Sequence, residues 1–253
     1  MRGMMIHQDA SKHLWLGESS CDLVVTMDDA TSEITSAFFC AEEGTMSSFR
    51  GIHETIARQG LFCSFYTDRG SHYFYTPEAG GKVDKFRLTE VGRALKQLGI
   101  IHIAAYSPEA RGRSERMFGT LQNRLVNELR LERITEIGAA NRYLQDDYLA
   151  RHDAPFMVKP DSETLAFTPV VGYDIANFLC MQADRTVSGD NNLRYEGMKL
   201  QIQQSAMRHH YVKAQVRVHH YPNDTLAIFH GPREIGRYHA DGILQQGEQK
   251  QAA

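Results

Sequence analysis

The spacing of apolar residues in the first half of the chain limits the folds that it can adopt. Three strand-like runs come first, at residues 4–9, 23–27 and 34–40. Helical and strand-like segments then alternate, at residues 45–59, 61–67, 89–99, 100–105 and 114–133. The resulting order, βββαβαβα, predicts an α/β domain built on a mixed sheet.

Local signals mark the ends of several of these segments. The run from Asp28 to Ser32 favours a turn, which predicts an antiparallel hairpin between the second and third strands. Gly60 can end the first helix and Thr89 can cap the start of the second. The third helix carries four apolar residues on one stripe: Phe118, Leu121, Leu125 and Leu129.

The pattern changes in the second half of the chain. A further helix is expected over residues 134–150, so the α/β domain would cover residues 1–151. Prolines and polar residues then predict a linker over residues 152–175. Alternating strand-like segments from 176 to 243 predict a small all-β barrel, and a polar, glutamine-rich tail over residues 244–253 is expected to be disordered.

Composition excludes several classes of protein. With 253 residues, 42% of them hydrophobic, the chain can bury a sizeable core. Its apolar runs fall far short of the roughly 20 residues that span a membrane, so we expect no membrane partner. The four cysteines form no Cys-x-x-Cys pair, which favours reduced thiols in the cytoplasm. A net charge of −3 does not suggest a tight, free-standing binder of nucleic acid.

Three acidic residues follow or open elements that a mixed sheet can bring together. Asp9 is expected to end the first strand, Asp68 follows the fourth, and Glu115 opens the third helix. Three carboxylates in one cleft repel each other unless protons or cations relieve the charge. Oxygen ligands suit Mg²⁺ or Mn²⁺, and two such ions can promote displacement at phosphorus.

The segments around these acids resemble the catalytic cores of DDE-type insertion-sequence transposases and retroviral integrases. The three segments read HQDAS at 7–11, YTDRGS at 66–71 and SPEARGRSER at 107–116. The likeness extends over roughly residues 6–133 and implies an RNase H-like fold. It also implies a two-metal polynucleotidyl transferase that nicks DNA at a transposon 3′ end and joins this end to target DNA.

The resemblance assigns Asp9, Asp68 and Glu115 as catalytic residues and as ligands of two Mg²⁺ or Mn²⁺ ions. Glu109 competes with Glu115 for the third position, but it precedes the turn at Gly112, and we favour Glu115. DNA contacts are expected from five polar or basic residues: Ser71, Arg111, Arg113, Arg116 and Gln122. Asp28 and Asp29 are interpreted as turn residues outside the site.

Transposases of this kind usually carry a helix-turn-helix region before the catalytic core, and this chain starts at the first strand of the core. We therefore expect a truncated form, with transposon-end binding supplied by an intact transposase or a separate domain. The expected partners are transposon and target DNA, on which the chain would act as a homo-oligomer. A bacterial cytoplasmic protein, associated with the nucleoid when bound to DNA, fits this interpretation.

Three alternatives stay open at this point. The chain could be an inactive remnant that only binds DNA or an intact transposase, or it could be an RNase H-like nuclease that cuts without joining. In addition, the pairs His209–His210 and His219–His220 suggest a zinc site, although neighbouring strand residues face opposite sides and a solvated surface is the simpler interpretation.

Overall fold

The chain forms two compact units, Met1–Leu179 and Cys180–Ala253. The computed structural model describes residues 1–78, 81–84, 86–106, 112–204 and 208–245. The predicted linker over residues 152–175 therefore falls within the first unit.

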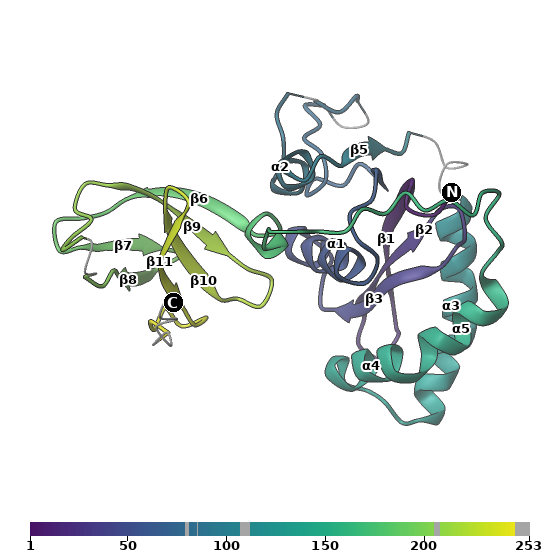
Figure 1. Ribbon diagram of the computed structural model, residues 1–253. Helices are drawn as coiled ribbons and strands as arrows, with labels where there is room; N and C mark the ends of the chain where they lie inside the picture. Colours follow the sequence, from purple (N-terminus) through teal and green to yellow (C-terminus); the bar gives the residue numbers. More distant parts are fainter. Residues whose placement is uncertain (79–80, 85, 107–111, 205–207, 246–253) are drawn as a thin grey trace. The chain divides into compact units, whose positions relative to one another are not determined.

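A five-stranded mixed sheet forms the centre of the first unit, with the strand order β3-β2-β1-β4-β5 (Figure 1). The strands are β1 (Met5–His13), β2 (Cys21–Asp28), β3 (Ile34–Cys40), β4 (Ser64–Thr67) and β5 (Ile101–Ala104). The first three are antiparallel to one another, whereas β4 is parallel to β1 and β5 is parallel to β4. This arrangement confirms the predicted α/β class and the mixed sheet.

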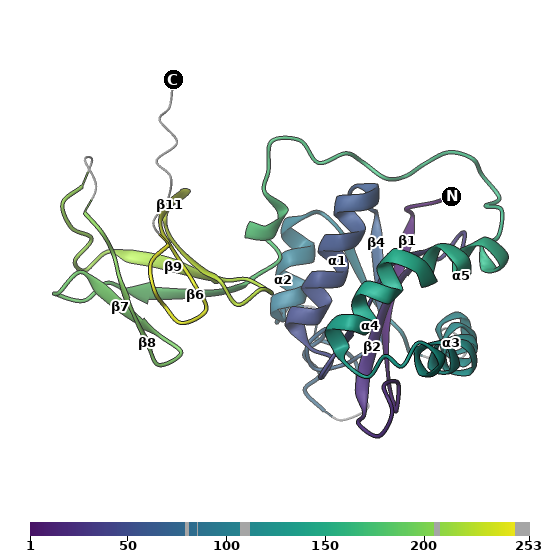
Figure 2. The ribbon, with the colours of Figure 1, turned by 90° about the horizontal axis from the view of Figure 1, so that it is seen from below.

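Helices cover both faces of this sheet, and Figure 2 shows α1 and α3 on opposite sides of the strands. The helices are α1 (Thr45–Gln59), α2 (Glu90–Gln97), α3 (Gly112–Leu131), α4 (Ile137–Tyr143) and α5 (Leu149–Phe156), with a π-helical turn (Leu144–Tyr148) and a short 3₁₀ turn (Ile175–Asn177). The predicted order βββαβαβα is confirmed through α3, and Thr89 caps α2 by accepting a hydrogen bond from the Gly92 amide. In the described part of the chain, no helix is long and apolar enough to cross a bilayer.

The apolar stripe of α3 packs as its spacing predicts. All four stripe residues are buried in one cluster with Leu23 and Val25 of β2, Phe39 of β3, and Trp15. Trp15 is 1% exposed and its indole nitrogen donates to the Ser11 carbonyl. This cluster fixes α3 against one face of the sheet.

The first strand is longer than the sequence predicts. It continues past Asp9 to His13, because residues 10–13 pair with the first half of β2. Asp9 therefore lies in the middle of β1, and the prediction that it ends the strand is wrong. A short apolar run underestimates a strand whose polar second half is held by a neighbouring strand.

The last helical stretch of the first unit also extends further than predicted. It ends at Phe156 and includes Pro155, where we expected a helix that stops at residue 150. The rings of Tyr148, His152 and Phe156 stack at successive i+4 positions, with centroids 5.5 and 4.7 Å apart, which supports the final turns. Beyond it, residue 168 pairs with Leu61 through two backbone hydrogen bonds, so this part of the predicted linker is held to the domain.

The turn between β2 and β3 depends on one buried carboxylate. Asp28 is 0% exposed, and its Oδ1 accepts three hydrogen bonds, from the Ala30 and Thr31 amides and the Thr31 hydroxyl. Its Oδ2 accepts a 2.7 Å hydrogen bond from the Gly3 amide. The interpretation of Asp28 as a turn residue agrees with these contacts.

The second unit contains two antiparallel sheets around a separate apolar cluster. One sheet has the order β11-β10-β9-β6 and the other pairs β7 with β8. The strands are β6 (Met181–Thr186), β7 (Asn192–Tyr195), β8 (Met198–Gln201), β9 (Gln215–His220), β10 (Leu226–His230) and β11 (Arg233–Tyr238). An all-β unit is thus present, and its closure into a barrel stays a prediction. The predicted tail starts with ordered contacts, because Leu244 pairs with Tyr238.

We expect that replacing Asp28 with alanine lowers the free energy of unfolding by about 3 kcal/mol, because several buried donors lose a charged acceptor. Urea unfolding of the Asp28→Ala variant measures this loss. Asp161→Ala, at an exposed loop position, is the matched control and should unfold like the wild type. Equal urea midpoints for the two variants would contradict the role assigned to Asp28.

Candidate active site

Asp9 and Asp68 lie just beyond the paired part of two neighbouring strands, β1 and β4. The parallel ladder between β1 and β4 pairs Met5 with Ser64 and His7 with Tyr66. Continued by two residues, this register would set Asp9 level with Asp68, which follows the end of β4. Paired strands are about 4.8 Å apart, so the register favours a position for Asp68 near Asp9, although the two residues lie beyond the last paired positions.

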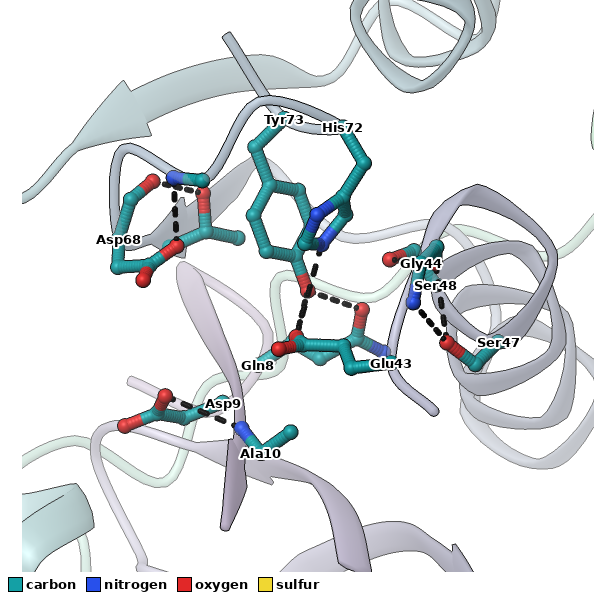
Figure 3. Close-up of polar contacts among 12 residues, drawn as sticks. Gln8, Asp9, Ala10, Glu43, Gly44, Ser47, Ser48, Asp68, His72 and Tyr73 are labelled. Carbon is teal, nitrogen blue, oxygen red and sulfur yellow. Dashed lines mark hydrogen bonds and ion pairs between the residues drawn. The ribbon is translucent and has the colours of Figure 1, made fainter. Parts of the chain in front are cut away.

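Asp9 lies on the face of the sheet that α3 covers. It pairs with Val25, whose side chain belongs to the α3 cluster. Asp9 is half-buried, and its Oδ1 accepts a 3.0 Å hydrogen bond from the amide of Ala10. Figure 3 shows the Asp68 side chain above Asp9, with both carboxylates facing the same space.

A tight turn holds Asp68 at the end of β4. Its Oδ1 accepts a 2.9 Å hydrogen bond from the amide of Gly70. A Cβ atom at Gly70 would lie 3.1 Å from both Asp68 Oδ1 and His72 Cε1. A larger residue would therefore crowd the Asp68 carboxylate in this turn. Ser71, a predicted DNA contact, is exposed in the same turn.

The rotation of α3 turns the Glu115 face toward β1. Glu115 and Gln122 are seven residues apart, so they share one face of the helix. The Nε2 atom of Gln122 donates a 3.0 Å hydrogen bond to Oγ of Ser11, two residues beyond Asp9 on β1. Glu115 itself is exposed in the first turn of α3.

The structure places the remaining predicted site residues as follows. Gln122, expected to face DNA, contacts Ser11, and its role on DNA stays a prediction.

The predicted arginine contacts are described only in part. Arg116 is exposed and lines a hollow of about 500 Å³ with Thr120 and His152. Arg111 and Glu109, as well as the side chain of Arg113, lie outside the described residues.

Metal ligands come together only in part. Figure 3 shows Asp9 and Asp68 in the same region, but no group of three His, Cys, Asp or Glu side chains among the described residues is close enough to hold a metal ion. The same finding covers the histidine pairs at the described positions of the second unit. There, His219 is buried on the ring of Phe229, with centroids 4.3 Å apart, and His220 lies 3.5 Å from carboxylates of Glu196 and Asp224.

Sequence reasoning missed a buried polar group beside the two aspartates. Tyr73 is 1% exposed, and its Oη lies 2.9 Å from Oε1 of Gln8 and 3.2 Å from Oε1 of Glu43 (Figure 3). The available signal was Gln8 itself, a polar residue within a strand and next to a candidate catalytic acid. Its partners come from distant parts of the chain, so the pattern alone could not identify them.

A buried, neutral histidine contacts Thr67, the residue that precedes Asp68. The Nε2 atom of His102, on β5, lies 3.1 Å from Oγ1 of Thr67, and its ring stacks on Phe74. Burial, followed by the nearby His72, lowers the pKa of His102 from 6.5 to about 3. The imidazole is therefore uncharged at neutral pH.

We expect stability to fall on acidification between about pH 6.5 and 3, because the unfolded chain then binds a proton that folded His102 excludes. The His102→Gln variant, neutral at every pH, should lose less stability over this range. Urea unfolding at several pH values measures the slope. Some slope should remain, because burial also lowers the pKa of His152.

The exposed His53 provides the matched control. His53→Gln should keep the wild-type slope, and an unchanged slope in His102→Gln would show that His102 does not cause it.

Comparisons with known proteins agree with the sequence resemblance. No family model matches the chain. The chain is 28% identical over 232 residues to y4bF of Sinorhizobium fredii, described as a transposase, a match that covers 89% of this chain and 50% of that protein. It is also 28% identical over 194 residues to the transposase for insertion sequence IS1202 of Streptococcus pneumoniae, a match that covers 77% of this chain and 41% of that protein.

The chain is thus similar in sequence to transposases, one of them from an insertion sequence, over most of its length, and the predicted resemblance is confirmed at this level. It spans about half the length of the curated relatives that it matches.

Solved structures of retroviral integrases are more distant neighbours. The HTLV-2 integrase catalytic core in complex with magnesium has a TM-score of 0.43 and 16% identity, over 55% of this chain and 80% of that one. The simian T-cell lymphotropic virus intasome in complex with the PP2A subunit B56 gamma has a TM-score of 0.45 and 13% identity, over 85% of this chain and 72% of that one.

Proposed function

We propose that the chain carries the catalytic core of a DDE-type transposase, with an RNase H-like fold and metal-dependent phosphoryl transfer as its activity. In this proposal the core nicks DNA at the transposon 3′ end and transfers that end to target DNA. Asp9, Asp68 and Glu115 are the catalytic residues.

The observation that carries this proposal is the register between β1 and β4. The ladder ends at His7 and Tyr66, and continuing its register by two residues on each strand would bring Asp9 level with Asp68, which supports a shared site for the two carboxylates. In the proposed site the two like charges would cost free energy unless a cation or a proton accompanies them. A pair of carboxylates in this arrangement therefore favours a cation-binding role over a structural one.

The third carboxylate is supported by the setting of α3. The hydrogen bond between Gln122 and Ser11 fixes the rotation of the helix, so that the face bearing Glu115 is turned toward the strand bearing Asp9. In the proposed active complex, Glu115 approaches the aspartate pair and completes the site.

The residues present fit Mg²⁺ or Mn²⁺. Asp9 and Asp68 offer only oxygen ligands, which these ions prefer, and there is no cysteine among the three proposed ligands. Two bound ions would activate an attacking oxygen and stabilise the leaving oxygen at phosphorus. The protein would orient the two ligands. The Gly70 amide holds the Asp68 carboxylate by a hydrogen bond, and pairing with β2 holds the backbone of Asp9.

DNA and a second copy of the chain are the proposed partners. Ser71 is exposed in the turn that follows Asp68, and Arg116 is exposed beside Glu115. Polar and basic groups at these positions could bind phosphates on either side of the carboxylates. Arg111, Arg113 and Gln122 stay in the proposed DNA-binding set, as does end recognition by an intact transposase or a separate domain.

We expect that Asp9→Asn, Asp68→Asn and Glu115→Gln each reduce metal-dependent DNA joining by about 100-fold or more, because metal stabilisation of the transition state is worth several kcal/mol. The assay measures insertion of a labelled oligonucleotide with a free 3′-hydroxyl into supercoiled plasmid, with Mg²⁺ or Mn²⁺. Calorimetric titration with Mn²⁺ measures binding to the same variants.

Glu132→Gln and Asp146→Asn remove exposed carboxylates away from the proposed ligands and serve as matched controls. Both should keep the wild-type affinity for Mn²⁺. Metal binding that is equal in the wild type and in Asp68→Asn would refute the proposed site, whereas metal-dependent cutting without joining would favour a nuclease.

A further inference from the structure

A buried amide connects β1 to its neighbour β2 on the face opposite Asp9. Gln8 is 1% exposed, and its Nε2 donates a 2.8 Å hydrogen bond to Oγ1 of Thr26. This contact leaves Oε1 of Gln8 directed toward Tyr73, whose hydroxyl lies 2.9 Å away. Both the nitrogen and the oxygen of the buried Gln8 amide are therefore hydrogen-bonded within the protein.

The Tyr73 hydroxyl acts as a hydrogen-bond donor. Burial and then the nearby Glu43 carboxylate raise the pKa of Tyr73 well above 10, so the phenol keeps its proton. The hydroxyl lies within reach of the Gln8 carbonyl and the Glu43 carboxylate, and a neutral phenol has one proton to donate between them. The Tyr73 ring packs against the ring of His72, with centroids 4.0 Å apart.

The packing of α1 leaves space for the Gln8 amide at a single glycine. A Cβ atom at Gly51 would lie 2.1 Å from Nε2 of Gln8 and 2.8 Å from Oγ1 of Thr26. Both distances are shorter than a non-bonded contact permits, so an alanine at position 51 would displace the amide. Three elements, α1, β1 and β2, are therefore fitted around one side chain.

These contacts join the two segments that carry the aspartates. Gln8 immediately precedes Asp9, and Tyr73 belongs to the loop that begins with Asp68. That loop is closed internally, since the Tyr73 amide donates to the Gly70 carbonyl and the Gly70 amide donates to Asp68. The ladder between β1 and β4 reaches only His7 and Tyr66. Beyond the ladder, the hydrogen bond between Tyr73 and Gln8 connects the loop after β4 to β1.

We propose that Tyr73 is a positioning residue that, through its hydrogen bond to Gln8, sets the separation of the Asp9 and Asp68 carboxylates. This inference rests on the proposed function, because it assigns Tyr73 a purpose in a site that binds metal ions. Under this proposal, the two carboxylates are not sufficient for metal binding. The loop after β4 must also be held to β1, by a contact on the face of the sheet opposite Asp9.

The test removes only the hydroxyl, in Tyr73→Phe. We expect Mn²⁺ affinity to fall about 10-fold, in the range seen when groups that orient metal ligands are changed. Joining should show a lower kcat with an unchanged KM for DNA. A metal-free signature is the amide proton of Gly70, whose NMR resonance should shift and whose hydrogen exchange should accelerate as the turn loosens.

A matched control separates positioning from stability. Tyr238, in the second compact unit, is also buried and donates a 2.9 Å hydrogen bond, to the Gln201 carbonyl. Tyr238→Phe should lose a similar free energy of unfolding without altering Mn²⁺ affinity. Gly51→Ala, which displaces Gln8 from the other side, should reproduce the metal and Gly70 effects of Tyr73→Phe.

Two failures can be told apart. If Asp68→Asn binds Mn²⁺ as the wild type does, the proposed site itself is wrong. If Asp68→Asn abolishes binding while Tyr73→Phe binds Mn²⁺ as Tyr238→Phe does and leaves the Gly70 resonance in place, the site stands and the positioning role is overturned.

Discussion

The proposed site depends on the unequal pairing of β1 on its two sides. On one side, β1 is paired with β2 from Ile6 to His13. On the other, β4 accompanies it only as far as His7. The sheet is therefore continuous on one side of Asp9 and open on the other, and the open side is where Asp68 arrives. In the proposed function, a rigid strand that carries a carboxylate next to an opening would combine precise placement with access for DNA.

The two faces of β1 serve different purposes. On the α3 face, the apolar stripe of the helix and Trp15 exclude water and fix the helix that bears Glu115. On the α1 face, the strand buries Gln8 beside Thr26, which is costly unless each polar atom finds a partner. Satisfied polar contacts depend on direction more than apolar packing does, so a polar group on the hidden face constrains the strand more sharply than another leucine would.

The sequence predicts the elements of this domain well and their lengths less well. The periodicity of α1 and α3 and the cap at Thr89 could be read locally, because each depends on residues close together in the chain. The extent of β1 could not, because residues 10–13 become strand through pairing with β2. The π-helical turn and the ring stack that carries the chain through Pro155 are likewise set by packing. Asp9 and Asp68 were recognisable from their motifs, whereas the contacts of Tyr73 join residues up to 65 positions apart.

One residue on the β3 edge of the sheet is hydrogen-bonded by a side chain that comes from far along the sequence. The Asn141 amide on α4 accepts a hydrogen bond from the Phe39 amide of β3 and donates one to the Phe39 carbonyl, and the two residues are 102 positions apart. A ribosome releases β3 long before it releases α4, so the amide and carbonyl of Phe39 lack this partner until α4 has been made. Until α4 docks, a nascent chain presents these groups on an open strand edge of the kind that pairs with other chains, and α4 then occupies them.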